Sequence, residues 1–334
     1  MPSLTQLTPA TCLDLPKLDS WPAARHKFEA ASIWAVRAAV ATKRPLLLRG
    51  EPGIGKSQLA RAVAQFLDVP FLYHVVDERS ERDDLLYAYD AVARLAEAQV
   101  SALTAATDPH WRKKLAERNF IRPGVLWWAF AWEDAAQQAA AFGQHCRTCP
   151  QPKAPDGWTP ASARECGPVV LVDEIDKADP SVPNGLLESL GNEGFQTALL
   201  GEAVRLAPGA KTPLIIITTN EERELPAAFL RRCLVLQMPF PATPEAAEVF
   251  LIERARVFHS AAEVSDSVCR AVVKALLEDR VAARREAMVK PGAAEFLDLV
   301  RALRELHPRD EKAQLAALAA IKDFALKKNP PEDL

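Results

Sequence analysis

Short apolar runs alternate with amphipathic segments along the first two thirds of the chain. Mainly apolar runs of strand length lie at 45–48, 69–76, 169–172 and 214–219. Between them lie segments with apolar residues at helical spacing, for example 28–40. This alternation predicts an α/β domain with a parallel sheet and right-handed crossovers.

The last third of the chain has a different pattern. From Thr243 onward no strand-like run occurs, and apolar residues recur at helical spacing with breaks at Pro291-Gly292 and His307-Pro308. Helices are predicted near 243–259, 264–286, 293–306 and 310–327. We therefore divide the chain into an N-terminal extension at 1–27, an α/β domain at 28–241 and a helical domain at 242–334.

Several segments of the α/β domain lie outside its regular alternation. Residues 83–103 are expected to be helical, and 195–206 resemble a hairpin that turns at Gly201-Glu202. The Cys-, Pro- and Gly-rich stretch 143–167 is expected to be a loop, of a length that is usually functional or disordered. We expect an aromatic cluster to belong to the core rather than to a partner-binding stripe, because large aromatics are mostly buried. Its members are Trp127, Trp128, Phe130 and Trp132.

Composition and charge argue against some classes of protein. The 334 residues carry a formal net charge of −3, whereas dedicated nucleic-acid binders usually have a basic surplus. Residues 1–18 lack the apolar core of a signal peptide, and the longest apolar runs are too short to span a bilayer. A cytoplasmic protein without a membrane segment is therefore expected.

The six cysteines are not expected to form disulfides in a cytosolic chain of this size. Four potential soft metal ligands lie near one another in the sequence, namely His145, Cys146, Cys149 and Cys166. The C-x-x-C spacing occurs in zinc sites, but the second pair of the recognised zinc patterns is missing. We favour free thiols in a surface loop over a structural zinc ion.

A glycine-rich segment between the first strand and the helix after it matches the phosphate-loop pattern G-x-x-x-x-G-K-[ST]. Its backbone N–H groups and the N-terminus of the following helix are suited to bind phosphates. Lys56 is expected to reach the β- and γ-phosphates, and Ser57 to ligate magnesium. The nucleotide-binding residues are predicted to be Gly50, Glu51, Pro52, Gly53, Ile54, Gly55, Lys56, Ser57 and Gln58.

Two acidic residues end the strand at 169–172. In magnesium-dependent hydrolysis of a nucleotide, Asp173 would hold the metal and Glu174 would take the proton from the attacking water. A helix N-cap with its neighbour is the alternative for such a pair. The phosphate loop earlier in the chain favours the hydrolytic interpretation.

Polar residues follow the strand at 214–219 as well. The amide of Asn220 is suited to orient the attacking water and to contact the γ-phosphate. About a dozen residues further on, Arg231 and Arg232 are suited to leave the subunit surface and reach a neighbour's γ-phosphate. A surface ion pair is the alternative for either arginine.

The order of these motifs resembles that of the AAA+ ATPases, and within them the MoxR-like, dynein-related branch. The phosphate loop resembles Walker A, Asp173-Glu174 resembles Walker B and Thr219-Asn220 resembles sensor 1. Arg232 resembles the arginine finger, with Arg231 as the alternative. The segments 122–125 and 186–194 also resemble family segments, so that the likeness covers about 28–330.

This resemblance implies a P-loop NTPase core with a C-terminal all-helical lid, ATP and Mg²⁺ as cofactors, and ATP hydrolysis. It also implies a homo-oligomeric ring, expected to be a hexamer, that remodels a client protein in the manner of a chaperone. MoxR-like proteins often act with a partner that bears a von Willebrand A domain, and here such a partner would act in trans. ATP rather than GTP rests on the resemblance alone.

The chain departs from the family pattern at two places. No arginine occupies the sensor 2 position near 290–295, where Lys290 is the available substitute. The separation of Lys56 from Asp173 is long, 173 − 56 = 117 residues, and the excess lies at 91–119 and 143–167. The first excess segment resembles the family's helix 2 insert.

Two other functions stay open at this point. One is a nucleotide-gated switch or scaffold with slow turnover, against which an intact Glu174 argues. The other is a nucleic-acid motor of restriction type, for which a basic strip is the required feature. The candidates for that strip are Arg94, Arg112, Lys113, Lys114, Arg118 and Arg205, although solvated helix charge also explains them.

Overall fold

The computed structural model describes residues 3–104, 110–145, 149, 151–285 and 289–326. The chain forms two compact units. The first unit comprises 1–8, 29–48 and 57–236, and the second comprises 9–28, 49–56 and 237–334.

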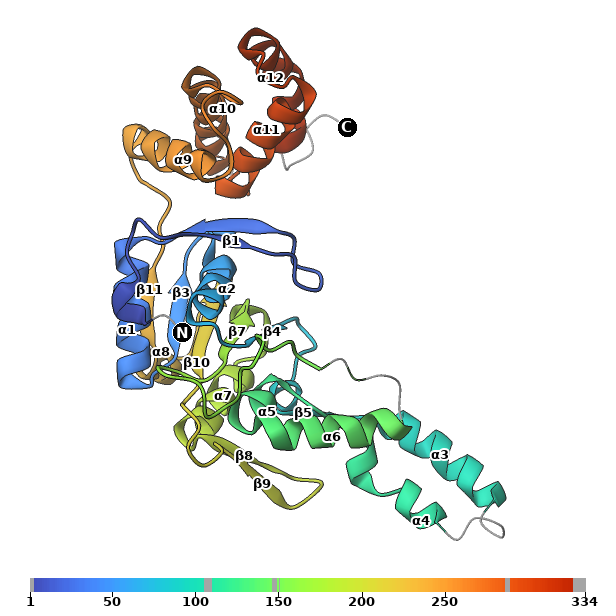
Figure 1. The fold of residues 1–334 in the computed structure, drawn as a ribbon. Helices are drawn as coiled ribbons and strands as arrows, with labels where there is room; N and C mark the ends of the chain where they lie inside the picture. The colour runs from blue at the N-terminus through green and yellow to red at the C-terminus, as the bar shows by residue number, and fades with distance from the viewer. Residues whose placement is uncertain (1–2, 105–109, 146–148, 150, 286–288, 327–334) are drawn as a thin grey trace. The chain divides into compact units, whose positions relative to one another are not determined.

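A five-stranded sheet forms the centre of the first unit (Figure 1). Its strands, in the order β11-β3-β10-β7-β4, are β11 (Leu234–Gln237), β3 (Leu46–Arg49), β10 (Leu214–Thr219), β7 (Val169–Asp173) and β4 (Phe71–Val75). β7 pairs in parallel with both β10 and β4. Every residue of β10 is buried, which explains its uninterrupted apolar sequence. Since parallel strands share their direction, the polar residues that follow β7 and β10 lie at one edge of the sheet.

The helices of the first unit surround this sheet and form an insert. They are α1 (Ala30–Thr42), α2 (Lys56–Leu67), α3 (Ala91–Thr104), α4 (Trp111–Lys114), α5 (Val125–Phe130), α6 (Trp132–His145), α7 (Ser181–Gly191) and α8 (Ala227–Arg232). α5 carries the aromatic cluster, and Trp127, Trp128 and Phe130 are at most 3% exposed. Trp132 is half-buried and packs edge-on against Trp128. The prediction that these aromatics belong to the core is confirmed.

Two small antiparallel sheets accompany the main one. β8 (Gly194–Thr197) pairs with β9 (Glu202–Arg205), which confirms the predicted hairpin. Its turn lies at 198–201 rather than at Gly201-Glu202, because Glu202 already pairs with Thr197. β5 (Tyr87–Tyr89) pairs with β6 (Ile121–Pro123). The helix predicted for 83–103 is therefore wrong in its first part, where a 3₁₀ turn at Arg82–Leu85 and β5 precede α3. Pairing with a strand more than thirty residues away outweighs the local helical pattern there.

The second unit contains a hairpin and a helical bundle. The hairpin joins β1 (Cys12–Leu15) and β2 (Ala24–Lys27) in antiparallel fashion, within the segment predicted only as an N-terminal extension. The helices are α9 (Pro244–Phe258), α10 (Asp266–Arg285), α11 (Ala293–Leu306) and α12 (Glu311–Leu326), close to their predicted bounds. Their fully buried residues include Leu251, Val272, Leu276, Phe296 and Leu303. In the described residues no helix is both long and apolar enough to cross a membrane.

Candidate nucleotide-binding and hydrolysis site

The phosphate loop folds around its own lysine. Lys56 is 6% exposed, and its Nζ donates hydrogen bonds to the carbonyl oxygens of Gly50 at 2.7 Å and Glu51 at 3.0 Å. Gly53 and Gly55 have φ values of +75° and +101°, which glycine adopts without the strain of a side chain. A Cβ atom at Gly53 would also lie only 2.7 Å from the Cβ of Ala294. The predicted glycines are therefore required by the shape of this loop.

An arginine of the helical bundle contacts the same loop. Arg280 of α10 binds the carboxylate of Glu51 through both Nη atoms, at 2.9 and 3.0 Å, and donates to the carbonyl oxygen of Pro291 at 2.7 Å. Its guanidinium lies 3.8 Å from the ring centroid of Phe240. Lys290, the cation predicted from the sequence, is exposed instead. Sequence reasoning missed Arg280, because no motif distinguishes it from the other charged residues of α10.

The two predicted magnesium ligands meet in the first unit. The hydroxyl of Ser57 donates to the carboxylate oxygens of Asp173 at 2.8 and 3.0 Å, and Thr218 donates to Asp173 Oδ1 at 2.5 Å. Magnesium prefers such hard oxygen ligands and usually takes only one or two carboxylates from the protein. The residues present therefore fit the ion. Thr218 was not predicted, although a threonine at the end of an apolar strand is a polar signal.

Glu174, the predicted base, is held at its backbone and at both carboxylate oxygens. Its N–H donates to Thr218 Oγ1 at 2.9 Å. Oε1 accepts from Asn220 Nδ2 at 3.1 Å, and Oε2 accepts from Lys177 Nζ at 2.6 Å. The hydrogen bond to Glu174 raises the pKa of the Lys177 ammonium. The structure thus brings the two predicted residues Glu174 and Asn220 into direct contact, which the sequence did not predict, and adds Lys177.

The backbone of Glu174 is in the left-handed region, with φ +60° and ψ +47°. This conformation costs a non-glycine residue on the order of 1–3 kcal/mol and is concentrated at functional sites. Here it turns the chain sharply at the end of β7, directly before the 3₁₀ turn at Ile175–Lys177.

A buried aspartate connects the segments that follow β7 and β10. Asp176 is 2% exposed and accepts hydrogen bonds from the N–H of Glu222 at 2.9 Å and from that of Asn220 at 3.4 Å. It therefore fixes the backbone from which the Asn220 amide reaches Glu174. Sequence reasoning missed this role, although Asp176 is the third carboxylate of the Asp-Glu-Ile-Asp run.

The two candidate arginines are separate from this cluster. Arg231 and Arg232 lie in the last turn of α8, and both are exposed. Among the residues that the structure describes, no carboxylate lies within ion-pair distance of either guanidinium. The structure thus brings neither arginine to Asp173 or Glu174 of the same chain through a hydrogen bond or ion pair.

The possible zinc ligands lie partly outside the described residues, since Cys146 is not among them. Within the described part of the chain, no three His, Cys, Asp or Glu side chains form a metal-binding group. Cys166 is buried, and its burial raises the pKa of its thiol to about 12. This thiol is therefore an inert core residue.

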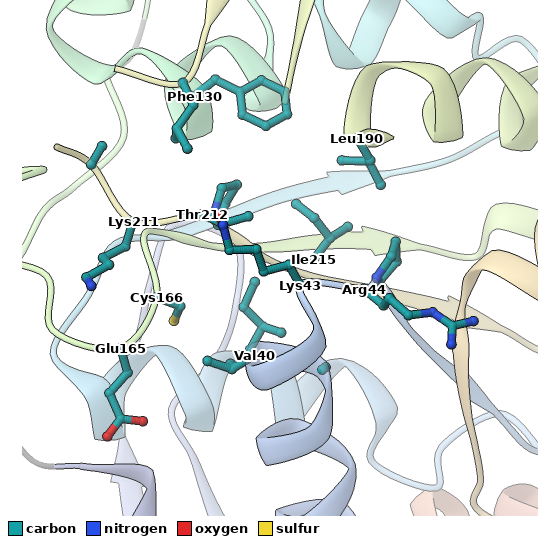
Figure 2. A pocket seen from close by; sticks show the side chains of 16 residues that line it. Val40, Lys43, Arg44, Phe130, Glu165, Cys166, Leu190, Lys211, Thr212 and Ile215 are labelled. Carbon is teal, nitrogen blue, oxygen red and sulfur yellow. The ribbon is translucent and has the colours of Figure 1, made fainter. Parts of the chain in front are cut away.

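A cavity of about 320 Å³ lies where strands β3 and β10 begin (Figure 2). Its lining includes Pro45 before β3 and Pro213 before β10, whereas the phosphate loop and Asn220 follow these strands. Ligands of open α/β sheets bind at the carboxyl ends of the strands. The cavity is therefore distinct from the nucleotide site.

Comparison with known proteins identifies the family. The model of the AAA domain in its dynein-related subfamily matches residues 45–233. NtrX from Brucella abortus in complex with ADP is 15% identical with a TM-score of 0.45, over 92% of this chain and 57% of that one. A mutant RuvB from Thermotoga maritima is 13% identical with a TM-score of 0.42, over 87% of this chain and 68% of that one. This chain thus spans a little over half the length of the NtrX chain. No curated protein matches it.

Proposed function

The chain belongs to the dynein-related subfamily of AAA domain proteins, whose model covers more than half of it, and we propose that it forms a ring that remodels a partner protein. Its established family makes it an ATP-binding protein and an ATPase that uses ATP and Mg²⁺. The ring, the client and the roles of individual residues are the proposal.

In the proposed chemistry each residue has one task. Gly50 to Gln58 bind the phosphates, with Lys56 at the β- and γ-phosphates, and Ser57 and Asp173 hold the magnesium ion. The bound ion supplies neutralisation of the charge on the phosphate oxygens. Glu174 accepts the proton of the attacking water, and Asn220 fixes the Glu174 carboxylate and the water. The hydrogen bonds among Ser57, Asp173, Glu174 and Asn220 support these roles.

The observation that carries the ring is the exposure of Arg231 and Arg232 without an ion-pair partner in the described part of the chain. An arginine supplied in trans to a γ-phosphate raises turnover by about 10³–10⁵. A site on one face that needs a residue from another face makes a heterologous interface, which forms a ring when the rotation between neighbouring subunits closes. A hexamer is the expected size, with Arg232 as the finger and Arg231 as the alternative.

The bidentate contact of Arg280 with Glu51 supports a link between the helical lid and the phosphate loop. A phosphate group competes with a carboxylate for a guanidinium, since both anions present two oxygens that accept parallel N–H bonds from the planar guanidinium. When ATP binds at the loop, Arg280 of α10 would exchange the Glu51 carboxylate for a phosphate group. The lid would sense the nucleotide in this way, without an arginine at the sensor 2 position.

Contact with the client is assigned to the insert at 91–119 and to the β8–β9 hairpin. The insert includes α3, whose Val92, Leu95 and Val100 are more than half exposed. Such exposed apolar side chains support a binding role for this helix. A MoxR-like chaperone function with a von Willebrand A domain partner in trans is the specific form that we propose.

The experiment that tests this proposal measures ATP turnover against protein concentration, with the mass of the assembly followed alongside. We expect the specific activity to rise as a ring forms. In the Glu174→Gln variant the ring should persist while turnover stops. Turnover that stays constant with concentration in a monomer would contradict the trans-acting arginine.

A nucleotide-gated switch is the second candidate, favoured by the grip of Lys177 and Asn220 on both oxygens of Glu174. An assembled ring without turnover would support it. The nucleic-acid motor is less favoured, because two of the basic residues that it requires are paired with acids. Arg94 binds Glu117 at 3.4 Å, and Arg118 binds Glu202 at 2.8 Å.

A further inference from the structure

Arg44 ties the segment before β3 to the end of α8. Its Nε donates to the carbonyl oxygen of Arg232 at 3.1 Å, and its Nη2 donates to those of Arg231 at 2.6 Å and Cys233 at 3.0 Å. These carbonyls belong to the last turn and the C-cap of α8, where a helix leaves its carbonyl groups without partners of its own. A guanidinium at this end also matches the negative end of the helix dipole.

The backbone of Arg44 is fixed on both sides. Its N–H donates to the carbonyl oxygen of Ala39 in α1 at 3.2 Å, and Lys43 before it caps α1 in the left-handed conformation. Pro45 after it accepts a hydrogen bond from the N–H of Leu234 at 2.8 Å, at the start of β11. The side chain borders the cavity, and its guanidinium is directed away from it (Figure 2). Arg44 is therefore a rigid support for the junction between α8 and β11.

α8 needs such a support for its two arginines to have a defined direction. It has only six residues, and a helix this short has little stability of its own. Phe229 is its one fully buried residue in the described structure, whereas Arg231 and Arg232 make no hydrogen bond or ion pair through their side chains there. Their direction therefore depends on the backbone that Arg44 binds.

We infer that Arg44 is a positioning residue that holds α8 so that Arg231 and Arg232 can reach the nucleotide of a neighbouring subunit. This inference rests on the proposed function, in which these arginines act in trans. In this arrangement β3 connects two sites. The strand leads into the phosphate loop of its own subunit, and Arg44 and Pro45 before it hold the helix end whose arginines serve the neighbouring subunit.

Helix α1, which ends shortly before Arg44, offers a matched control. Arg37 donates hydrogen bonds to the carbonyl oxygens of Leu4 at 2.8 Å, Thr5 at 3.2 Å and Leu7 at 3.0 Å. Arg37→Ala thus removes the same kind of contact as Arg44→Ala, but at the N-terminal segment instead of at α8. We expect assembled Arg44→Ala to lose at least about 10-fold in turnover and Arg37→Ala to stay near the native rate.

A mixing experiment separates positioning in trans from damage to the subunit's own site. The Arg44→Ala subunit keeps Glu174, and the Glu174→Gln subunit keeps Arg231 and Arg232 in their native position. Each variant therefore supplies the group that is missing or misplaced in the other. In rings assembled from equal amounts, about a quarter of the interfaces combine an intact Glu174 with an intact neighbouring arginine. We expect turnover to reappear in the mixture at about that fraction of the native rate. Arg232→Ala mixed with Glu174→Gln is the positive control.

The outcomes distinguish the inference from its premise. If the positive control regains turnover and the Arg44→Ala mixture does not, Arg44 acts on its own subunit and the inference is wrong. Native turnover in assembled Arg44→Ala would also overturn it. If Arg44→Ala does not assemble, Arg44→Lys is tested in the same way, and loss of assembly in both variants would overturn it as well. If the positive control itself fails, the trans-acting arginine of the proposed function is wrong, whatever Arg44 does.

Discussion

The acids at the end of β7 and the arginines at the end of α8 differ in how many partners the chain provides for them. Asp173 and Glu174 accept hydrogen bonds from the side chains of Ser57, Thr218, Asn220 and Lys177. Arg231 and Arg232 have exposed side chains that bind no described residue, and only their backbone is held. The side chains of the acids are thus held by residues of their own subunit. The arginines are held only through their backbone, and their side chains are exposed.

This difference indicates how the proposed reaction is divided between neighbouring subunits. Positioned acids and amides need fixed hydrogen bonds, because a catalytic group that moves by about 1 Å can lose about 10²-fold in rate. An arginine that serves a neighbour needs an exposed guanidinium on a fixed helix. Substitution of an acid should therefore stop turnover in the substituted subunit itself. Substitution of an arginine should stop turnover in the neighbouring subunit.

The largest effect is expected for Arg232→Ala, measured as ATP turnover in assembled rings. Loss of an arginine finger lowers turnover by about 10³–10⁵, because the developing charge on the γ-phosphate loses its counterion. ATP affinity measured with a fluorescent analogue should change little. Arg231→Ala is the matched variant, and we expect it to retain more activity. If both variants keep the native rate, α8 does not supply the finger.

The next largest effect is expected for Glu174→Gln. A glutamine cannot accept the proton of the attacking water, so turnover should fall by about 10²–10⁴ while ATP binding and assembly persist. Glu188→Gln removes an exposed carboxylate of α7 that pairs with Arg82, and serves as the control with native turnover. Equal activity of Glu174→Gln and the native protein would show that Glu174 is not the base.

The sequence predicts the fold well where the pattern is local. The fully buried strand β10 and the helices α9 to α12 follow from apolar runs and helical spacing alone. β11 was not predicted, because its Leu-Val-Leu-Gln sequence is only four residues long and half exposed. The hairpin β1–β2 was also missed, since its exposed strands depend on pairing rather than on a buried face.

The candidate site divides in the same way. Residues inside motifs, such as Lys56, Ser57 and Asp173, could be predicted because spacing and chemistry suffice. Arg280, Asp176 and Arg44 could not, because their roles depend on residues 229, 44 and 188 positions away in the sequence. Contacts of this range arise only when the chain folds.

A smaller effect is expected for Asp176→Asn, which tests whether the cis region depends on its buried support. The asparagine replaces one acceptor with an NH₂ group that faces a backbone N–H, so the loop that carries Asn220 should shift. We expect about a 10-fold loss of turnover and a destabilisation of about 1–3 kcal/mol, measured by denaturant unfolding. Asp179→Asn is the control, since Asp179 is exposed and its Oδ1 accepts a hydrogen bond from the N–H of Ser181 that an asparagine oxygen can also accept. Equal turnover in the two variants would remove Asp176 from the site.

The smallest effect, of opposite sign, is expected for Lys177→Met. The Lys177 ammonium lies 2.6 Å from Glu174 Oε2, and the partners are 37% and 29% exposed. A partly exposed ion pair contributes about 0.2–1 kcal/mol, so its removal should free the carboxylate to accept a proton and raise basal turnover about 2- to 5-fold. Lys177→Arg keeps the charge and should stay near the native rate. A loss of turnover in Lys177→Met would show instead that the ammonium holds Glu174 in its working position, and that the cis region of the site includes a cation of its own.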